Sequence, residues 1–112
     1  MRPVVYIAGP YTNGDCVANT RTAMDMWHVL FDMGFAPICP HWSMFQHFLT
    51  PLGYEDWLDY DFALIDKCDF LLRIEGESSG ADREIKHAHY RRIPVAYSLG
   101  ELVELRKLRF PD

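Results

Sequence analysis

The chain has 112 residues, of which 49% are hydrophobic and 14% are aromatic. This composition excludes a disordered or low-complexity chain, and the length supports one hydrophobic core. The formal net charge is -5. Because affinity for nucleic acid comes largely from clustered Lys and Arg, this acidic balance argues against a nucleic-acid partner.

The first half of the chain predicts two strands separated by a helix. Val4–Ala8 is a continuous apolar run closed by Gly9-Pro10, which is typical of a strand buried on both faces of a parallel sheet. Apolar residues recur with helical spacing over residues 15–33, and Phe35–Cys39 reads as a second short strand. Residues 40–53 form an aromatic-rich connection, and a connection of this length in so small a domain is often functional.

The second half continues the alternation of helices and strands. The expected elements are a helix over Tyr54–Cys68, a strand over Asp69–Ile74, a helix over Gly80–Arg91, a strand over Pro94–Tyr97 and a helix over Leu99–Leu108. Strands that alternate with helices imply right-handed crossovers and a parallel sheet with helices on both faces. Ligands of such sheets bind at the carboxyl ends of the strands.

The cysteines and histidines do not predict a metal site. Cys16, Cys39 and Cys68 lack C-x-x-C spacing, so neither a disulfide framework nor a zinc site is predicted, and a reducing cytoplasm is the expected location. The histidines complete no ligand set at metal spacing. The N-terminal residues do not form a signal peptide and no apolar run reaches membrane length, so no membrane partner is expected.

One acidic residue interrupts the apolar stripe of the helix over residues 54–68. Steps of four, three, four and three residues along this helix give Tyr54, Leu58, Asp61, Ile65 and Cys68. A carboxylate on an apolar stripe is costly unless it is hydrogen-bonded, paired or facing a cleft. Asp61 is therefore either a site residue or a buried Asp that is satisfied by a backbone N–H, Tyr11 or Tyr60.

The segment Ser78–Glu84 joins the third strand to the helix that follows it. Such a turn directs backbone N–H groups and the positive end of the helix dipole at the space above the strand, which suits an anionic ligand. Glu84 would stand beside that ligand, and the small Ala81 and Ala88 leave its carboxylate uncovered. The alternative is ordinary helix capping, because Ser79-Gly80-Ala81-Asp82 fits the capping-box pattern.

Two carboxylates that converge on one cleft are what a retaining glycosyl-transfer enzyme needs. The motifs are Tyr6-Ile7-Ala8-Gly9-Pro10-Tyr11, Asp61 eight residues before Asp69, and Ser78-x-Gly80-x-x-x-Glu84. With these motifs the chain resembles the nucleoside 2-deoxyribosyltransferase superfamily. The resemblance implies a flavodoxin-like three-layer α/β domain over residues 1–112, with a four- to five-stranded parallel sheet. It also implies a homo-oligomer of two or more subunits.

The resemblance assigns roles to individual residues. It implies that Glu84 is the nucleophile, that Asp61 handles the base and that Tyr6 orients the nucleophile. The position six residues before the nucleophile separates branches of the superfamily, with Asp for free nucleosides and Ser for nucleoside 5′-monophosphates. This chain has Ser78, whose hydroxyl and following helix-start N–H groups favour a phosphate dianion, and Arg83 could add positive charge.

The remaining expected substrate-binding residues are Gly80, Gly9, Tyr11, His41, Trp42 and Gln46. The aromatic residues of the 40–53 connection either cover the core or form a wall on which a base stacks, with Gln46 or His41 reading its edge. The prediction is hydrolysis of the N-glycosidic bond of a (deoxy)nucleoside 5′-monophosphate through a glutamyl glycosyl-enzyme, with no metal or cofactor. The alternatives are a deoxyribosyltransferase that exchanges bases and a non-catalytic nucleotide-binding module.

Overall fold

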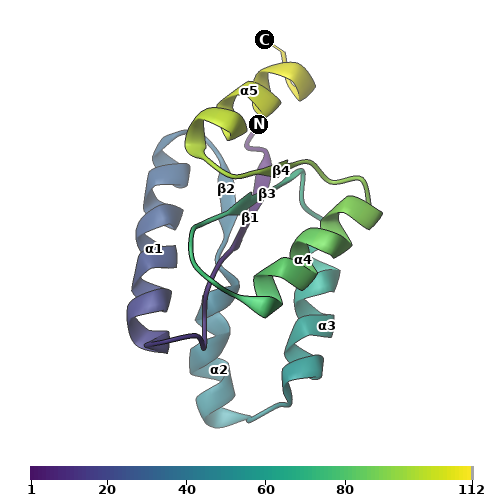
Figure 1. Cartoon of the computed structure of the whole chain (residues 1–112). Coiled ribbons are helices and arrows are strands. Elements are labelled where there is room, and N and C mark those ends of the chain that lie inside the picture. The colour runs from purple at the N-terminus through teal and green to yellow at the C-terminus, as the bar shows by residue number, and fades with distance from the viewer. Residues whose placement is uncertain (112) are drawn as a thin grey trace.

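The computed structural model describes residues 1–111 and contains a four-stranded, all-parallel sheet with the strand order β2-β1-β3-β4 (Figure 1). Along the chain the elements are β1 (Val4–Ala8), α1 (Cys16–Asp32), β2 (Ala36–Ile38), the 3-10 turn η1 (Pro40–Trp42), α2 (Ser43–Leu49), α3 (Tyr54–Ile65), β3 (Phe70–Arg73), α4 (Ser79–Tyr90), β4 (Val95–Ala96) and α5 (Leu99–Arg109). The predicted flavodoxin-like three-layer α/β fold is confirmed. Asp112, the last residue of the expected domain, lies outside the described residues.

The sheet separates two hydrophobic cores. Successive side chains of a strand point to opposite faces, so Val5 and Ile7 of β1 pack with α1 and α5, whereas Tyr6 and Ala8 pack with α3 and α4. Figure 1 shows α1 on one side of the sheet and α3 with α4 on the other. Because of this alternation, Tyr6 points toward the face that carries Glu84.

The central strands β1 and β3 end side by side. Their register pairs Val5 with Phe70 and Ala8 with Arg73, and the Ile74 N–H donates to the Ala8 carbonyl at 2.8 Å. A Cβ at Gly9 would lie 2.2 Å from Ile74 Cγ1, so only glycine permits this close approach. The carboxyl ends of the two strands therefore open onto one space, where ligands of parallel sheets bind.

The connection over residues 40–53 is more ordered than the sequence predicts. It contains η1, which begins at Pro40, and the helix α2, which begins at Ser43 and ends where the Thr50 N–H donates to the Gln46 carbonyl. Of the α2 side chains, only Met44 is buried, so the segment lacks the apolar stripe that identifies a helix in a sequence. The aromatic residues Phe45 and Phe48 are exposed.

No helix within residues 1–111 is long and apolar enough to cross a membrane. The longest of them, α1, has 17 residues and is capped by Asp15, whose carboxylate accepts from the N–H groups of Val17 and Ala18 at 2.9 and 3.2 Å.

Candidate active site

A cavity of about 340 Å³ lies at the carboxyl ends of β1 and β3. Its wall combines the turn after β1, the segment from η1 to α3 and the start of α4. Seven of the predicted site residues line it: Glu84, Asp61, Ser78, Gly80, Gly9, Tyr11 and His41. Residues from four separate parts of the chain thus meet in one space.

Glu84 is held against the sheet by Tyr6. Both side chains are buried, with 5% and 0% of their surface exposed, and the Tyr6 hydroxyl donates to Glu84 Oε2. Burial raises the pKa of Glu84; the hydrogen bond from Tyr6 lowers it, and the charge of Asp61 raises it further. Burial also raises the pKa of Tyr6 well above its ordinary value, so this hydroxyl remains the proton donor.

Asp61 reaches the same cavity from α3. Within residues 1–111 its Oδ1 atom is buried and has no hydrogen-bond partner, so neither a backbone N–H nor Tyr11 or Tyr60 satisfies it. Burial raises the pKa of Asp61 to about 6, against the effect of Glu84 and Tyr6, which favour the ionised form. A buried carboxyl oxygen without a partner at a cavity wall is more typical of a functional group than of a structural one.

The ionisation of one carboxyl affects that of the other. The pKa of Glu84 is raised to about 8 and that of Asp61 to about 6, and each group affects the other. The two carboxyls therefore titrate as a pair in a poorly solvated site. Such a pair can present one ionised and one protonated carboxyl at the same time, which is the requirement for nucleophilic attack with proton donation.

The start of α4 offers N–H groups to the cavity. Ser78 is the N-cap, and its Oγ accepts from the Ala81 N–H at 3.0 Å, so the capping residue is Ser78 and not Ser79 as in the predicted capping box. The N–H groups of Ser79 and Gly80 have no acceptor within the helix, because the first turn lacks a preceding one. A Cβ at Gly80 would lie 3.2 Å from the Tyr54 hydroxyl, so Tyr54 stands directly beside this helix start.

Arg83 does not contribute charge to the cavity, contrary to the prediction. Its guanidinium forms two hydrogen bonds with Glu55, at 2.6 and 3.0 Å, and lies 5.8 Å from the ring centroid of Tyr54. This ion pair joins α3 to α4 on the outside of the protein. Within residues 1–111, no Lys or Arg lines the cavity.

Arg73 orders the loop between β3 and α4. Its guanidinium donates to the carbonyls of Ile74 and Gly76 and lies 3.5 Å from a carboxylate oxygen of Asp82. The charge of Arg73 also lowers the pKa of Glu84, but its effect is smaller than the effects of burial, Tyr6 and Asp61. Its main contribution is therefore to the shape of the loop that carries Ser78.

His41 is a buried, neutral imidazole in the cavity wall. Its Nε2 donates to the Pro10 carbonyl at 2.9 Å, and its Nδ1 is buried without a hydrogen-bond partner among residues 1–111. Burial lowers the pKa of His41, which keeps the ring uncharged. Tyr11 lies edge-on to this ring with a centroid separation of 5.9 Å.

Two predicted residues do not reach the cavity. Trp42 packs against Trp27 with a centroid separation of 5.9 Å and remains 44% exposed. Gln46 lies on the exposed face of α2 and donates to Thr50 Oγ1 at 3.1 Å. Trp42 therefore covers α1 instead of a ligand, and Gln46 faces solvent.

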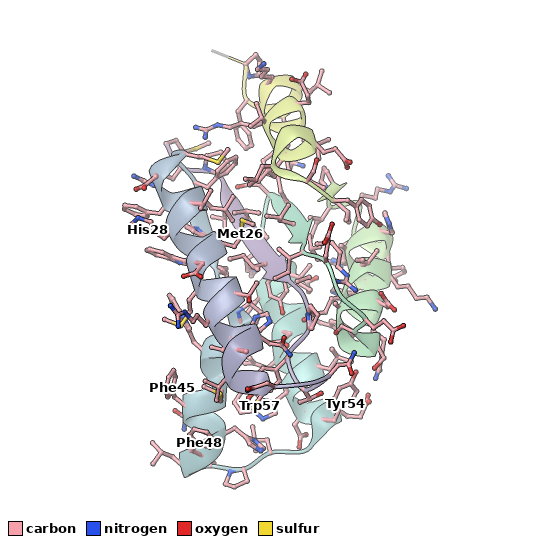
Figure 2. All side chains as sticks on the ribbon, turned by 60° about the vertical axis from the view of Figure 1, so that its left-hand side comes forward. Met26, His28, Phe45, Phe48, Tyr54 and Trp57 are labelled. Carbon is pink, nitrogen blue, oxygen red and sulfur yellow. The ribbon has the colours of Figure 1, made fainter. Side chains whose placement is uncertain are left out.

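Other residues take their place. His47 of α2 and the α3 residues Tyr54 and Trp57, which are labelled in Figure 2, line the cavity. Trp57 donates its indole N–H to His47 Nδ1 at 2.9 Å. Tyr54 and Trp57 precede Asp61 by seven and four residues, which places all three on one face of the helix. The helical spacing from Asp61 could have identified Trp57. No pattern in the sequence identifies His47, whose position depends on the contact between α2 and α3.

Within residues 1–111, no group of three or more His, Cys, Asp and Glu side chains could hold a metal ion. In a comparison with known proteins, the model of a family described as a domain of unknown function (DUF7768) matches residues 3–98, a span that contains the whole cavity wall. No curated protein matches the chain.

Proposed function

The chain belongs to the family described as a domain of unknown function (DUF7768), and we propose that it cleaves the N-glycosidic bond of a (deoxy)nucleoside 5′-monophosphate. The observation that carries the proposal is the convergence of Glu84 and Asp61 on one cavity, with Tyr6 hydrogen-bonded to Glu84 from behind. The resemblance of the same residues to the nucleoside 2-deoxyribosyltransferase superfamily supports it.

In the proposed reaction, a Glu84 carboxylate oxygen attacks the anomeric carbon and the bond from that carbon to the base nitrogen breaks. The bonding pair leaves with the base, and Asp61 transfers its proton to the base and becomes a carboxylate. Water then attacks the anomeric carbon of the glycosyl-enzyme, loses a proton to Asp61 and releases Glu84 as a carboxylate. No metal or organic cofactor is needed for this sequence.

The position of the proton decides when the site is reactive. Glu84 must be ionised to attack, yet burial raises its pKa to about 8 even though the hydrogen bond from Tyr6 favours the ionised form. The pKa of Asp61 is raised only to about 6, so the free protein favours the proton on Glu84. We propose that the reactive form, with the proton on Asp61 and the negative charge on Glu84, is the minor one in the free protein.

The phosphate-binding part of the proposal depends on the start of α4. The hydroxyl of Ser78 and the N–H groups of Ser79 and Gly80 lie at the cavity and suit an anion. One observation favours a second candidate, a transferase that exchanges bases between unphosphorylated nucleosides: no Lys or Arg within residues 1–111 lines the cavity. In the homo-oligomer that the resemblance implies, a neighbouring subunit would complete the phosphate site.

The decisive experiment is a screen of nucleoside 5′-monophosphates and nucleosides for released base, with wild type and Glu84→Gln. We expect Glu84→Gln to lose turnover by about 10³-fold or more and to keep ligand binding, because the amide preserves the shape of the nucleophile and removes its charge. Mass spectrometry of quenched wild-type reactions should detect a glycosyl adduct on the protein. Digestion of the same samples should locate the adduct on the peptide that contains Glu84.

The matched control is Glu77→Gln, an identical change at an exposed carboxylate in the loop before α4, which should release base like wild type. Near-normal base release by Glu84→Gln would reject the proposed nucleophile. Wild-type protein that binds nucleotides and releases no base would support a non-catalytic binding module, and a requirement for an acceptor base would support the transferase.

A further inference from the structure

A contact between α2 and α3 fixes the hydrogen-bonding roles of one histidine in the cavity wall. His47 Nδ1 accepts from the indole N–H of Trp57 at 2.9 Å and from the backbone N–H of Leu52 at 3.2 Å. Both partners can only donate, so Nδ1 carries its lone pair and the ring proton is on Nε2. Within residues 1–111, Nε2 makes no hydrogen bond. His47 thus has one polar group left for a ligand, an N–H donor.

Apolar side chains form much of the cavity wall beside His47. Leu52, Trp57 and Leu58 line the cavity with it, and the ring centroids of His47 and Trp57 are 6.1 Å apart at an interplanar angle of 60°. Ser43, one helical turn before His47, adds a hydroxyl to the same wall. In Figure 2, Phe45 and Phe48 lie on the outer side of α2, away from Trp57. A flat heterocycle that enters this part of the cavity meets hydrocarbon surface and the directed N–H of His47, so the group opposite that N–H helps to decide which heterocycle fits.

We propose that His47 is a specificity-determining residue whose Nε2–H donates to an exocyclic carbonyl oxygen of the leaving base. Keto bases are then preferred over amino bases at that position. An amino group there would direct its own N–H at the His47 N–H, so two donors would face each other and neither would be satisfied by the other. The inference deepens the proposed function and rests on it for the nature of the ligand.

The test compares two pairs of free bases that differ by a keto or an amino group, hypoxanthine with adenine and uracil with cytosine. Binding is measured by calorimetry, and base release is measured separately from the corresponding 5′-monophosphates. The variant is His47→Asn, whose side-chain oxygen can still accept from Trp57 and Leu52 but which has no donor at the position of Nε2. The matched control is His28→Asn on α1, because the His28 side chain is 74% exposed and pairs with Asp32.

We expect the wild type to bind the keto member of at least one pair more tightly. His47→Asn should reduce that preference about tenfold, the factor that corresponds to about 1.4 kcal/mol, and should leave the affinity for the amino member within about twofold. His28→Asn should keep the wild-type preference. An unchanged preference in folded His47→Asn, or an equal loss for both members of each pair, would overturn the inference, since an equal loss is what a purely structural histidine would cause.

A second measurement needs no variant. In long-range ¹H–¹⁵N spectra of the wild type, the His47 ring should show an unprotonated Nδ1 and a protonated Nε2, and the keto base should shift Nε2–H more than its amino partner does. Equal shifts, or no binding of any of the four bases, would overturn the inference. If the protein binds keto bases more tightly but releases no base from nucleotides, the inference stands and the proposed cleavage is rejected. If the rate of base release depends neither on the identity of the base nor on His47, the proposed cleavage stands and the inference is rejected.

Discussion

Tyr6 connects the centre of the sheet to the proposed nucleophile. It is fully buried in β1, and its hydroxyl donates to Glu84. Without this hydrogen bond, the effects of burial and of the Asp61 charge on Glu84 would be opposed only by the smaller effect of Arg73. The residue that fills the core at this point is therefore also the one that favours the ionised nucleophile.

We predict that Tyr6→Phe shifts the acid limb of the pH–rate profile to higher pH. The hydrogen bond from Tyr6 lowers the pKa of Glu84, so its removal raises that pKa and leaves a smaller ionised fraction at any pH below it. A shift of one pH unit reduces the rate on the acid limb about tenfold. Single-turnover base release between pH 5 and 9 measures the limb. A lower rate with an unmoved limb would show that Tyr6 acts only by positioning.

At the scale of the element, the start of α4 combines a structural and a proposed ligand-binding task. Ser78 caps the helix through its Oγ, and the same residue lines the cavity. Asp caps helices as well as Ser does, so a charge can be introduced here without loss of the helix.

We therefore predict that Ser78→Asp erases or inverts the preference for a 5′-monophosphate over its nucleoside. A carboxylate beside the phosphate repels it, whereas charge-assisted hydrogen bonds from the wild-type site contribute roughly 1.5–3 kcal/mol each. Parallel rates on one nucleoside and its monophosphate measure the preference. Ser78→Asn, a neutral N-cap that also lacks the hydroxyl, separates the two effects and should weaken the preference without inverting it. A wild-type protein that favours the free nucleoside would move the chain to the transferase alternative.

Most elements could be predicted from the sequence because their signals are local. The apolar run Val4–Ala8 and the helical spacing after Asp15 are confirmed as β1 and α1. The helix α2 could not be predicted, since its one buried side chain, Met44, gives no periodic pattern. The helix is fixed by its packing against neighbours, which a single sequence does not display.

The candidate site also divides into residues with local sequence signals and residues whose roles depend on distant contacts. Asp61 and Glu84 could be identified from their own helices, one as an acid on an apolar stripe and the other at a helix start. His47 and the pairing of Arg83 with Glu55 could not, because each depends on contacts between segments that are distant in the sequence. For Trp42 the sequence leaves two roles open, core cover or cavity wall, because aromatic character does not reveal which neighbour a side chain covers; in the structure Trp42 packs against Trp27.

At the scale of the whole molecule, the two carboxyls make stability depend on pH. Burial raises the pKa of Glu84 from 4.5 to about 8 and that of Asp61 from 3.8 to about 6. At a pH between the ordinary pKa of each group and its raised pKa, the folded protein binds more protons than the unfolded chain does. The free energy of unfolding contributed by these groups therefore falls as pH rises through that range.

We predict that the melting temperature of the wild type decreases from about pH 5 to pH 8 more steeply than that of Glu84→Gln. The amide cannot ionise, so it removes the cost of a buried charge at high pH and should make the variant the more stable protein near pH 8. Thermal melts at matched ionic strength measure both curves. Glu77→Gln should follow the wild-type slope. Parallel curves for wild type and Glu84→Gln would show that ionisation of Glu84 is not coupled to folding.

The division of the core by the sheet leaves the two faces under different constraints. Side chains between the sheet and α1 or α5 meet apolar neighbours, so their replacement is limited by stability alone. On the other face, Ala81 and Ala88 pack α4 against the sheet, and a larger residue at either position would displace the backbone that carries Glu84. Sequence drift can therefore proceed on the α1 and α5 face for as long as the protein folds. Under the proposed function, every accepted change on the α3 and α4 face must also preserve the distance between the two carboxyls.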